Sequence, residues 1–182
     1  MDLTEKLFES ERIFKGRLLG LRRDTVVLPD GRHGTREVIE HPGAVAVAAL
    51  TEDGGVLMVE QYRYAVGRQL LEIPAGCLEP GEEPLACAVR ELREETGACA
   101  KEWTPLGYIY PTAGCSGEVI HLFAARGLSF GEGQLDADEF LTLRTLPWAE
   151  ALEQCISGEN PDAKTVAALL RLAQLRAAGL PL

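Results

Sequence analysis

The chain has 182 residues, of which 46% are hydrophobic and 25% charged, and its 18 Lys and Arg against 28 Asp and Glu give a net charge of −10. These values fit one folded domain with at most a small appendage. They argue against a disordered chain, and against nucleic acid or an anionic membrane as the main partner. The apolar runs are too short to span a bilayer, and the first ten residues do not have the pattern of a signal peptide.

Short alternating segments in the first part of the chain predict β-strands joined by turns. The turn sequences are Pro29-Asp30-Gly31 and Glu52–Gly55, and each is expected to close a hairpin. The predicted strands are Glu11–Arg17, Leu21–Leu28, Gly34–His41, Ala44–Leu50, Val56–Tyr62 and Gln69–Ile73.

From Pro84 to Thr96 the apolar residues recur with the period of a helix. Pro84 suits a first helical position, and Gly97 suits a stop. The apolar side chains of one face are expected to be buried, opposite the acidic side, and are Leu85, Ala88, Val89 and Leu92.

The rest of the chain returns to strands and then ends in helices. The predicted strands are Trp103–Tyr110, Glu118–Ala124 and Phe140–Leu143, and the predicted helices are Pro147–Ile156 and Asp162–Ala178. The inner stripe of the last helix is expected at Val166, Leu169, Leu170 and Ala173. Strands on both sides of one helix, followed by two helices, indicate an α+β layered domain rather than regular βαβ repeats.

The stretch Gly76–Ala98, GCLEPGEEPLACAVRELREETGA, carries the chemistry. Glu91, Glu94 and Glu95 stand at i, i+3 and i+4, so their carboxylates converge on one side of the helix. At roughly 4 Å and an effective dielectric of ~20, each pair repels by about 4 kcal/mol. In a cleft a divalent cation would offset this repulsion, and oxygen ligands select Mg²⁺ or Mn²⁺. For a bare acidic run, a solvated helix face is the alternative.

The spacing of the other residues disfavours that alternative. Gly76 is followed after five residues by Glu82, and after seven more by Arg90-Glu91-Leu92-Arg93-Glu94-Glu95-Thr96-Gly97-Ala98. Seven fixed identities match by chance at roughly one in 10⁸ per start position. The stretch resembles the box of the Nudix hydrolases, with every defined position filled.

The resemblance implies a fold, a reaction and a cofactor. The fold is α+β, a mixed β-sheet sandwiched between helices, with a small N-terminal antiparallel sheet in residues 1–42 and the Nudix hydrolase domain in residues 43–182. The reaction is hydrolysis of a P–O–P linkage without a covalent enzyme intermediate, with Mg²⁺ or Mn²⁺ as cofactor.

Carried over by position, the box also implies metal ligands. Glu91 and Glu95 are the first candidates, with Glu94 and the carbonyl of Ala75 beside them. Glu82 is implied as an outer ligand or a structural partner.

Three further residues of the box have implied supporting roles. Arg90 would pair with the acids and hold their geometry. Gly76 would allow a close approach, and Gly97 would leave the helix with a positive φ.

Segments on both sides of the box narrow the resemblance to the ADP-ribose pyrophosphatase branch, over about residues 35–170. They include REVIEHPGAVAVAAL, VLMVEQYRYAVGRQLLEIPAG, YPTAGCSGEVIHLFAA, QLDADEFL and GENPDAKTVAALL. The branch implies cleavage of ADP-ribose or a related nucleotide sugar to a nucleoside monophosphate and a sugar phosphate. It also implies a homodimer whose N-terminal strands cross over, so that both chains build each site.

The same branch suggests substrate contacts and a general base. Arg36 and Glu37 match positions at the nucleoside end, and Arg63 matches an arginine near the phosphates or ribose, although a plain surface charge is the alternative for each arginine. Glu139 is the first candidate base. Glu118 is second and also a candidate substrate contact, and a box glutamate such as Glu94 is third.

Some alternatives stay open. Ala113 stands where the branch usually has a proline, so a broader nucleotide-sugar pyrophosphatase competes with a strict ADP-ribose enzyme. A non-catalytic ADP-ribose sensor is disfavoured, because every acid of the box is retained and no further domain follows by residue 182. Five cysteines without a CxxC pair suit reduced thiols, so we expect a cytoplasmic location.

Overall fold

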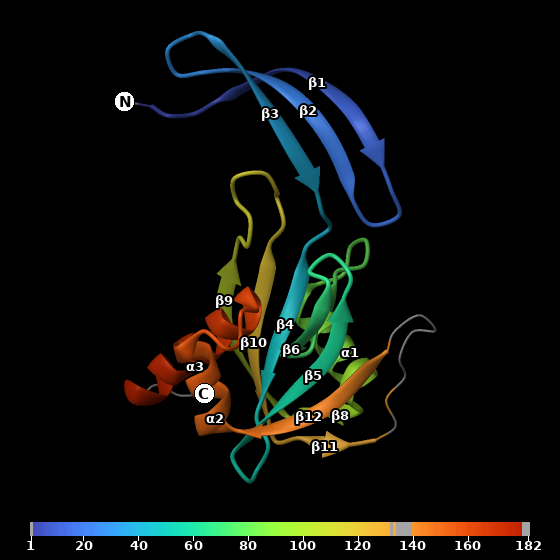
Figure 1. Cartoon of the computed structure of the whole chain (residues 1–182), viewed down its shortest axis with the longest axis vertical. Helices are drawn as coiled ribbons and strands as arrows, with labels where there is room; N and C mark the ends of the chain where they lie inside the picture. The colour runs from blue at the N-terminus through green and yellow to red at the C-terminus, as the bar shows by residue number, and fades with distance from the viewer. Residues whose placement is uncertain (1, 132, 134–139, 180–182) are drawn as a thin grey trace. The chain divides into compact units, whose positions relative to one another are not determined.

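The computed structural model describes residues 2–131, 133 and 140–179, and the chain divides into two compact units (Figure 1). Unit 1 comprises Met1–Gly43 and Tyr110–Val119, and unit 2 comprises Ala44–Ile109 and Ile120–Leu182. In the part of the chain that the structure describes, no helix is long and apolar enough to cross a membrane.

Unit 1 is built on a three-stranded antiparallel sheet. Its strands, in spatial order, are β1 (Lys6–Lys15), β2 (Gly20–Val27) and β3 (His33–Glu40). The first predicted hairpin is confirmed, because β2 pairs with β3 around a turn in which the Leu28 N–H donates to the Arg32 carbonyl at 2.7 Å. The loop Tyr110–Val119 joins this unit through the Ile39 N–H, which donates to the Cys115 carbonyl at 2.8 Å.

The first strand has almost no apolar cover. Strand β1 begins five residues before the predicted start, and all ten of its residues are exposed. Val26 on β2 is the one apolar side chain that is fully buried among the described residues of unit 1. A sheet of this kind buries too little apolar surface to be stable by itself.

The described residues of unit 2 form a mixed sheet, an antiparallel sheet, a two-stranded ribbon and three helices. The mixed sheet has the order β7-β4-β10-β9, in which β4 and β10 are parallel, and the others have the orders β12-β5-β6 and β11-β8. The strands are β4 (Ala44–Ala49), β5 (Gly55–Arg63), β6 (Arg68–Glu72), β7 (Ala75–Cys77), β8 (Ala98–Cys99), β9 (Glu102–Ile109), β10 (Ile120–Arg126), β11 (Ser129–Phe130) and β12 (Leu141–Pro147). The helices are α1 (Pro84–Thr96), α2 (Trp148–Ser157) and α3 (Ala163–Ala177).

Strand β4 is the centre of this unit, and all six of its residues are buried. Ala46 and Ala48 pack into the cluster that includes α2 and α3, while Val45 and Val47 pack into the cluster that includes α1. A continuous apolar run is what a strand covered on both faces requires. The predicted α+β fold, with a mixed sheet between helices, is confirmed.

The second predicted hairpin is wrong. The turn itself forms, since the Thr51 N–H donates to the Gly55 carbonyl at 3.0 Å. However, β4 and β5 belong to different sheets and are linked at an isolated bridge between Leu50 and Val56. The two strands diverge because β4 pairs with β7 and β10, whereas β5 pairs with β6 and β12.

Helix α1 has the predicted limits, but only Ala88 and Leu92 of the four residues predicted on its buried face are buried. It ends at Gly97, which has a φ of 69° and donates its N–H to the Arg93 carbonyl. Leu85 and Val89 are each 45% exposed, so their expected burial is wrong. The buried residues of the helix are Cys87, Ala88, Glu91, Leu92, Glu95 and Thr96. Glu91 and Glu95 therefore share the buried face with the apolar side chains, because polar groups that can pair with them lie beneath the helix.

Candidate active site

The strand Ala75–Cys77 lies beneath the acidic side of α1. Strand β7 is held at the edge of the mixed sheet by pairing with the beginning of β4. The carboxylate of Glu95, a residue only 7% exposed, accepts a hydrogen bond from the Ala75 N–H at 3.0 Å. Glu91 is 9% exposed, and its carboxylate lies where a Cβ on Gly76 would be. The predicted need for a close approach at Gly76 is confirmed.

Arg90 connects three carboxylates of this site. Its Nε and Nη2 donate to the two oxygens of Glu82, each at 2.9 Å, and Nη1 donates to Glu91 at 2.7 Å and to Glu94 at 3.1 Å. The Cys77 carbonyl accepts a further bond from Nη2 at 3.1 Å. The bidentate contact with the guanidinium lowers the pKa of Glu82 to about 2, and the same contact raises the pKa of Arg90.

The carboxylates of this site suit a divalent cation, although Arg90 forms ion pairs with Glu82, Glu91 and Glu94. Within residues 2–131, 133 and 140–179, no three His, Cys, Asp or Glu side chains already form a metal-holding group. Glu91 and Glu95 are nevertheless buried carboxylates one helical turn apart, and both lie against the Ala75–Gly76 backbone. Oxygen donors of this kind match the preference of Mg²⁺ and Mn²⁺.

A second charged network in unit 2 holds Arg63. Its Nε and Nη2 donate to the two oxygens of Glu72, each at 2.7 Å, and Lys164 Nζ donates to the same carboxylate. Glu72 is 1% exposed; burial raises its pKa, but the hydrogen bonds from the two cations outweigh this effect, so the pKa is lowered overall. The side chain of Arg63 keeps 39% of its surface exposed.

Sequence reasoning missed Glu72 and Lys164. A signal for Glu72 was present, because it is a single carboxylate in the otherwise apolar run Leu70–Ile73. A charge in such a run needs a partner when the strand is buried. No comparable local signal pointed to Lys164, which lies 92 residues further along the chain.

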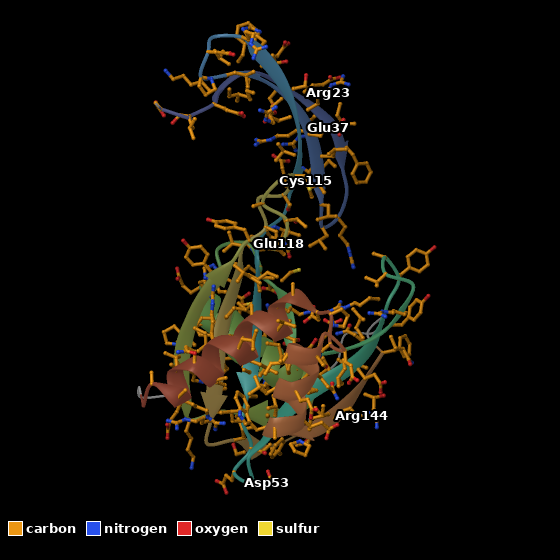
Figure 2. All side chains as sticks on the ribbon, turned by 60° about the vertical axis from the view of Figure 1, so that its left-hand side comes forward. Arg23, Glu37, Asp53, Cys115, Glu118 and Arg144 are labelled. Atoms are coloured by element: carbon orange, nitrogen blue, oxygen red, sulfur yellow. The ribbon has the colours of Figure 1, made fainter. Side chains whose placement is uncertain are left out.

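Three predicted substrate contacts belong to unit 1. Arg36 donates from Nε to Glu5 at 2.9 Å and makes a second bond from Nη2 to the other oxygen of that carboxylate. Glu37 lies opposite Arg23 in the register of β2 and β3, and Figure 2 labels both on the N-terminal sheet. Because successive residues of a strand point to opposite faces, Arg36 and Glu37 do not share a face of the sheet.

Glu118 stands on the loop Tyr110–Val119 (Figure 2). Its Oε1 is 3.9 Å from His41 Nε2, and its N–H donates to Ser116 Oγ at 3.1 Å. The structure therefore groups the box residues with Arg63 in unit 2, and places Arg36, Glu37 and Glu118 in unit 1. Glu139, the first candidate base, lies outside the described residues.

A mixed sheet between helices, with a buried acidic helix face against an edge strand, defines a hydrolase fold of the Nudix type. The NUDIX domain model matches residues 40–169, and the model of the nucleoside diphosphate sugar hydrolase N-terminal domain matches residues 5–39. The chain belongs to the Nudix family and is a Nudix pyrophosphohydrolase.

Named relatives agree with this assignment. The chain is 44% identical to the ADP-ribose pyrophosphatase of Bacillus subtilis (strain 168), over 92% of this chain and 91% of the relative. It is also 44% identical to the methanol dehydrogenase activator of Bacillus methanolicus, over 91% and 90% of the two chains. The crystal structure of an ADP compounds hydrolase shares the fold, with a TM-score of 0.85 over 98% of both chains at 21% identity.

Proposed function

We propose that this chain hydrolyses the diphosphate linkage of ADP-ribose or a related nucleotide sugar, giving a nucleoside monophosphate and a sugar phosphate. The observation that carries the proposal is the buried pair Glu91 and Glu95, held against Ala75 and Gly76. The pyrophosphatase from Bacillus subtilis supports ADP-ribose as the first substrate to test.

We further propose Mg²⁺ as the cofactor, with Mn²⁺ as a substitute, held by Glu91, Glu94, Glu95 and the carbonyl of Ala75. Such an ion, when bound, supplies positive charge for the bridging phosphates and acidifies a water molecule. The protein supplies the geometry: the Ala75 N–H orients one carboxylate, and Gly76 leaves room for another. Arg90 offsets the repulsion among the acids.

The general base is proposed to be Glu139, with Glu118 and Glu94 as the second and third candidates. A base must reach the attacking water, and its removal lowers kcat by about 10² to 10⁴. The three Glu→Gln variants, measured side by side across pH, rank the candidates, because only loss of the base removes the acidic limb of the kcat profile.

We propose Arg63 as the contact to the phosphates or ribose. The ion pair with Glu72 fixes its guanidinium while part of the side chain stays open to solvent. A fixed, planar donor is well suited to a diphosphate. Arg36 and Glu37 are proposed to contact the nucleoside.

A homodimer is proposed from the N-terminal sheet. Leu7, Phe8, Ile13 and Phe14 leave a strand of ten residues with apolar side chains in solvent. A second copy of the chain would cover this surface, as exposed apolar patches of this kind usually require. A cytoplasmic location is proposed as well, since the five cysteines are free thiols.

The deciding experiment is a substrate panel. The purified protein is incubated with Mg²⁺ and ADP-ribose, ADP-glucose, GDP-mannose, NADH or a dinucleoside polyphosphate, and the products are identified by ion-pair chromatography. We expect AMP and ribose 5-phosphate from ADP-ribose. No cleavage of any compound with Mg²⁺ or Mn²⁺ would overturn the proposal.

A broader nucleotide-sugar pyrophosphatase is the second candidate. Ala113 stands in the exposed loop of unit 1 in place of the proline usual in the ADP-ribose branch, and the N-terminal match names nucleoside diphosphate sugars in general. Similar kcat/KM values for several sugars on the panel would favour this candidate. The retained acids of α1 argue against a binding-only sensor.

A further inference from the structure

The chain crosses between the two larger sheets of unit 2 at Ile73 and Pro74. Strand β6 ends at Glu72 in one sheet, and β7 begins at Ala75 in the other. Neither residue is part of the paired registers of β6 or β7, although the Pro74 carbonyl accepts a hydrogen bond from the Val47 N–H of β4 at 2.9 Å. Ala75 and Gly76, which contact the carboxylates of α1, follow immediately. Whatever holds the crossing therefore also holds the strand of the candidate site.

Polar side chains in the first turn of α3 and just before it contact three consecutive residues, Leu71–Ile73, of which the last lies in the crossing. Asn160 Nδ2 donates to the first carbonyl at 2.8 Å, and Lys164 Nζ donates to the carboxylate of the second residue. Thr165 Oγ1 accepts the N–H of the third at 2.9 Å. We call Asn160, Lys164 and Thr165 the α3 clamp.

Thr165 is fixed in this arrangement by the N-cap of its own helix. Its N–H and its hydroxyl both donate to Asp162 Oδ2, at 3.0 and 2.5 Å. Because the hydroxyl hydrogen is used there, the oxygen keeps its lone pairs for the Ile73 N–H. Both Thr165 and Ile73 are fully buried, so water does not replace this bond.

We infer that Thr165 is a positioning residue of the active site, which sets the place of the Ala75–Gly76 backbone through the Ile73 N–H, together with the pairing of β7 with β4. The inference rests on the proposed function, because it concerns the strand against which the proposed metal ligands lie. Thr165 acts on the site through the backbone of Ile73 and Pro74, which leads into Ala75. Groups that orient ligands in this indirect way change metal affinity or activity by about tenfold to a hundredfold when removed.

The test compares Thr165→Val, which keeps the volume but loses the hydroxyl, with Thr165→Ser, which keeps the hydroxyl. Binding of Mn²⁺ to the free protein is measured from the electron paramagnetic resonance signal of the unbound ion. We expect Thr165→Val to raise the Kd for Mn²⁺ by about tenfold to a hundredfold. We expect Thr165→Ser to restore it, and kcat to fall more than KM rises in the valine variant.

Two controls separate positioning from a general loss of stability. Leu172→Ala removes a fully buried apolar side chain from the same helix without touching the α3 clamp. It should lower the Tm while leaving the Kd for Mn²⁺ near the wild-type value. Hydrogen exchange should rise in the peptide spanning residues 71–77 in Thr165→Val, and not in Thr165→Ser.

The outcomes are distinguishable. Unchanged Mn²⁺ binding in Thr165→Val, or an equal rise in Leu172→Ala, overturns the positioning role and leaves the proposed function intact. A wild-type chain that binds no Mn²⁺ overturns both.

Discussion

The carboxylate of Glu91 occupies the space into which a Cβ on Gly76 would project. In Gly76→Ala we therefore expect the helix or the edge strand to shift, at a cost of about 1–3 kcal/mol in the free energy of unfolding. A displacement of about 1 Å lowers turnover by roughly 10²-fold. Urea denaturation and kcat for ADP-ribose measure the two effects.

A double variant tests whether this contact is the cause. Glu91→Asp shortens the side chain and relieves the overlap, so the free energies of unfolding in Gly76→Ala and Glu91→Asp should not add. We expect the combined loss to be smaller than the sum by at least about 0.5 kcal/mol. Additive losses would show that Gly76 matters for another reason.

The second prediction concerns charge at Glu95. Glu95→Gln keeps an oxygen that accepts the Ala75 N–H, so the fold should persist. Loss of the negative charge should lower kcat by orders of magnitude, on the order of 10² or more if the carboxylate is a metal ligand. Circular dichroism checks the fold and product formation checks kcat. Full activity in this variant would remove Glu95 from the proposed metal site.

The third prediction concerns Arg90 and the removal of metal. Arg90→Ala leaves Glu82, Glu91 and Glu94 without their shared guanidinium, so we expect a loss of about 2–4 kcal/mol in the presence of a chelator. Added Mg²⁺ should recover part of this loss, because a divalent cation restores positive charge among the acids.

Arg93→Ala is the matched control for this experiment. Arg93 is exposed on the same helix, so its removal should change stability by less than about 1 kcal/mol with or without Mg²⁺. If Mg²⁺ stabilised both variants equally, the role of Arg90 in offsetting the repulsion would be refuted.

The fourth prediction concerns acid. The pKa of Glu82 is about 2 in the folded chain, against an ordinary value of 4.5. A depressed pKa means that the folded state favours the charged form, so this stabilisation is complete above about pH 4.5 and is lost as the pH falls through 2. We expect Glu82→Gln to lose about 1–3 kcal/mol at pH 7 and to approach the wild-type stability only at about pH 2 and below. Unfolding followed across pH measures this, and a constant difference would contradict it.

The fifth prediction concerns oligomeric state. Phe14 on β1 is 58% exposed in the single chain, and Phe130 on β11 is 60% exposed. If the N-terminal sheet is the dimer surface, Phe14→Ser should raise the dimer Kd by about 30-fold or more, as expected for loss of a central aromatic contact. Phe130→Ser should leave it unchanged. Sedimentation velocity over a dilution series measures the dimer Kd of both variants. A wild-type chain that is monomeric would rule the dimer out.

Local signals were sufficient to predict the limits of α1 and the residues of its acidic side. Pro84 starts the helix by its fixed φ, and Gly97 ends it by a conformation that other residues resist, so neither depends on the rest of the fold. The strand hairpin around Gly31 was predictable for the same reason.

The apolar pattern of α1 predicted the burial of Ala88 and Leu92, but not that of its two glutamates. Glu95 is buried because the Ala75 N–H, 20 residues earlier in the chain, satisfies its carboxylate. In the α3 clamp, Thr165 and Ile73 lie 92 residues apart, so no neighbouring residue in the sequence indicates this contact. The turn Thr51–Gly55 indicated a hairpin, but a turn carries no information about which sheet each strand joins.

That turn offers a practical point of attachment. Residues 52–54 are exposed, and Figure 2 shows Asp53 at the tip of its loop. Strand β4 pairs with Gly76 at Val45 and then runs directly away towards Thr51, a distance of about 20 Å at roughly 3.3 Å per residue. A short affinity tag or a surface tether inserted between Glu52 and Gly54 would thus hold the enzyme at the end of its central strand that lies away from the pairing of Val45 with Gly76.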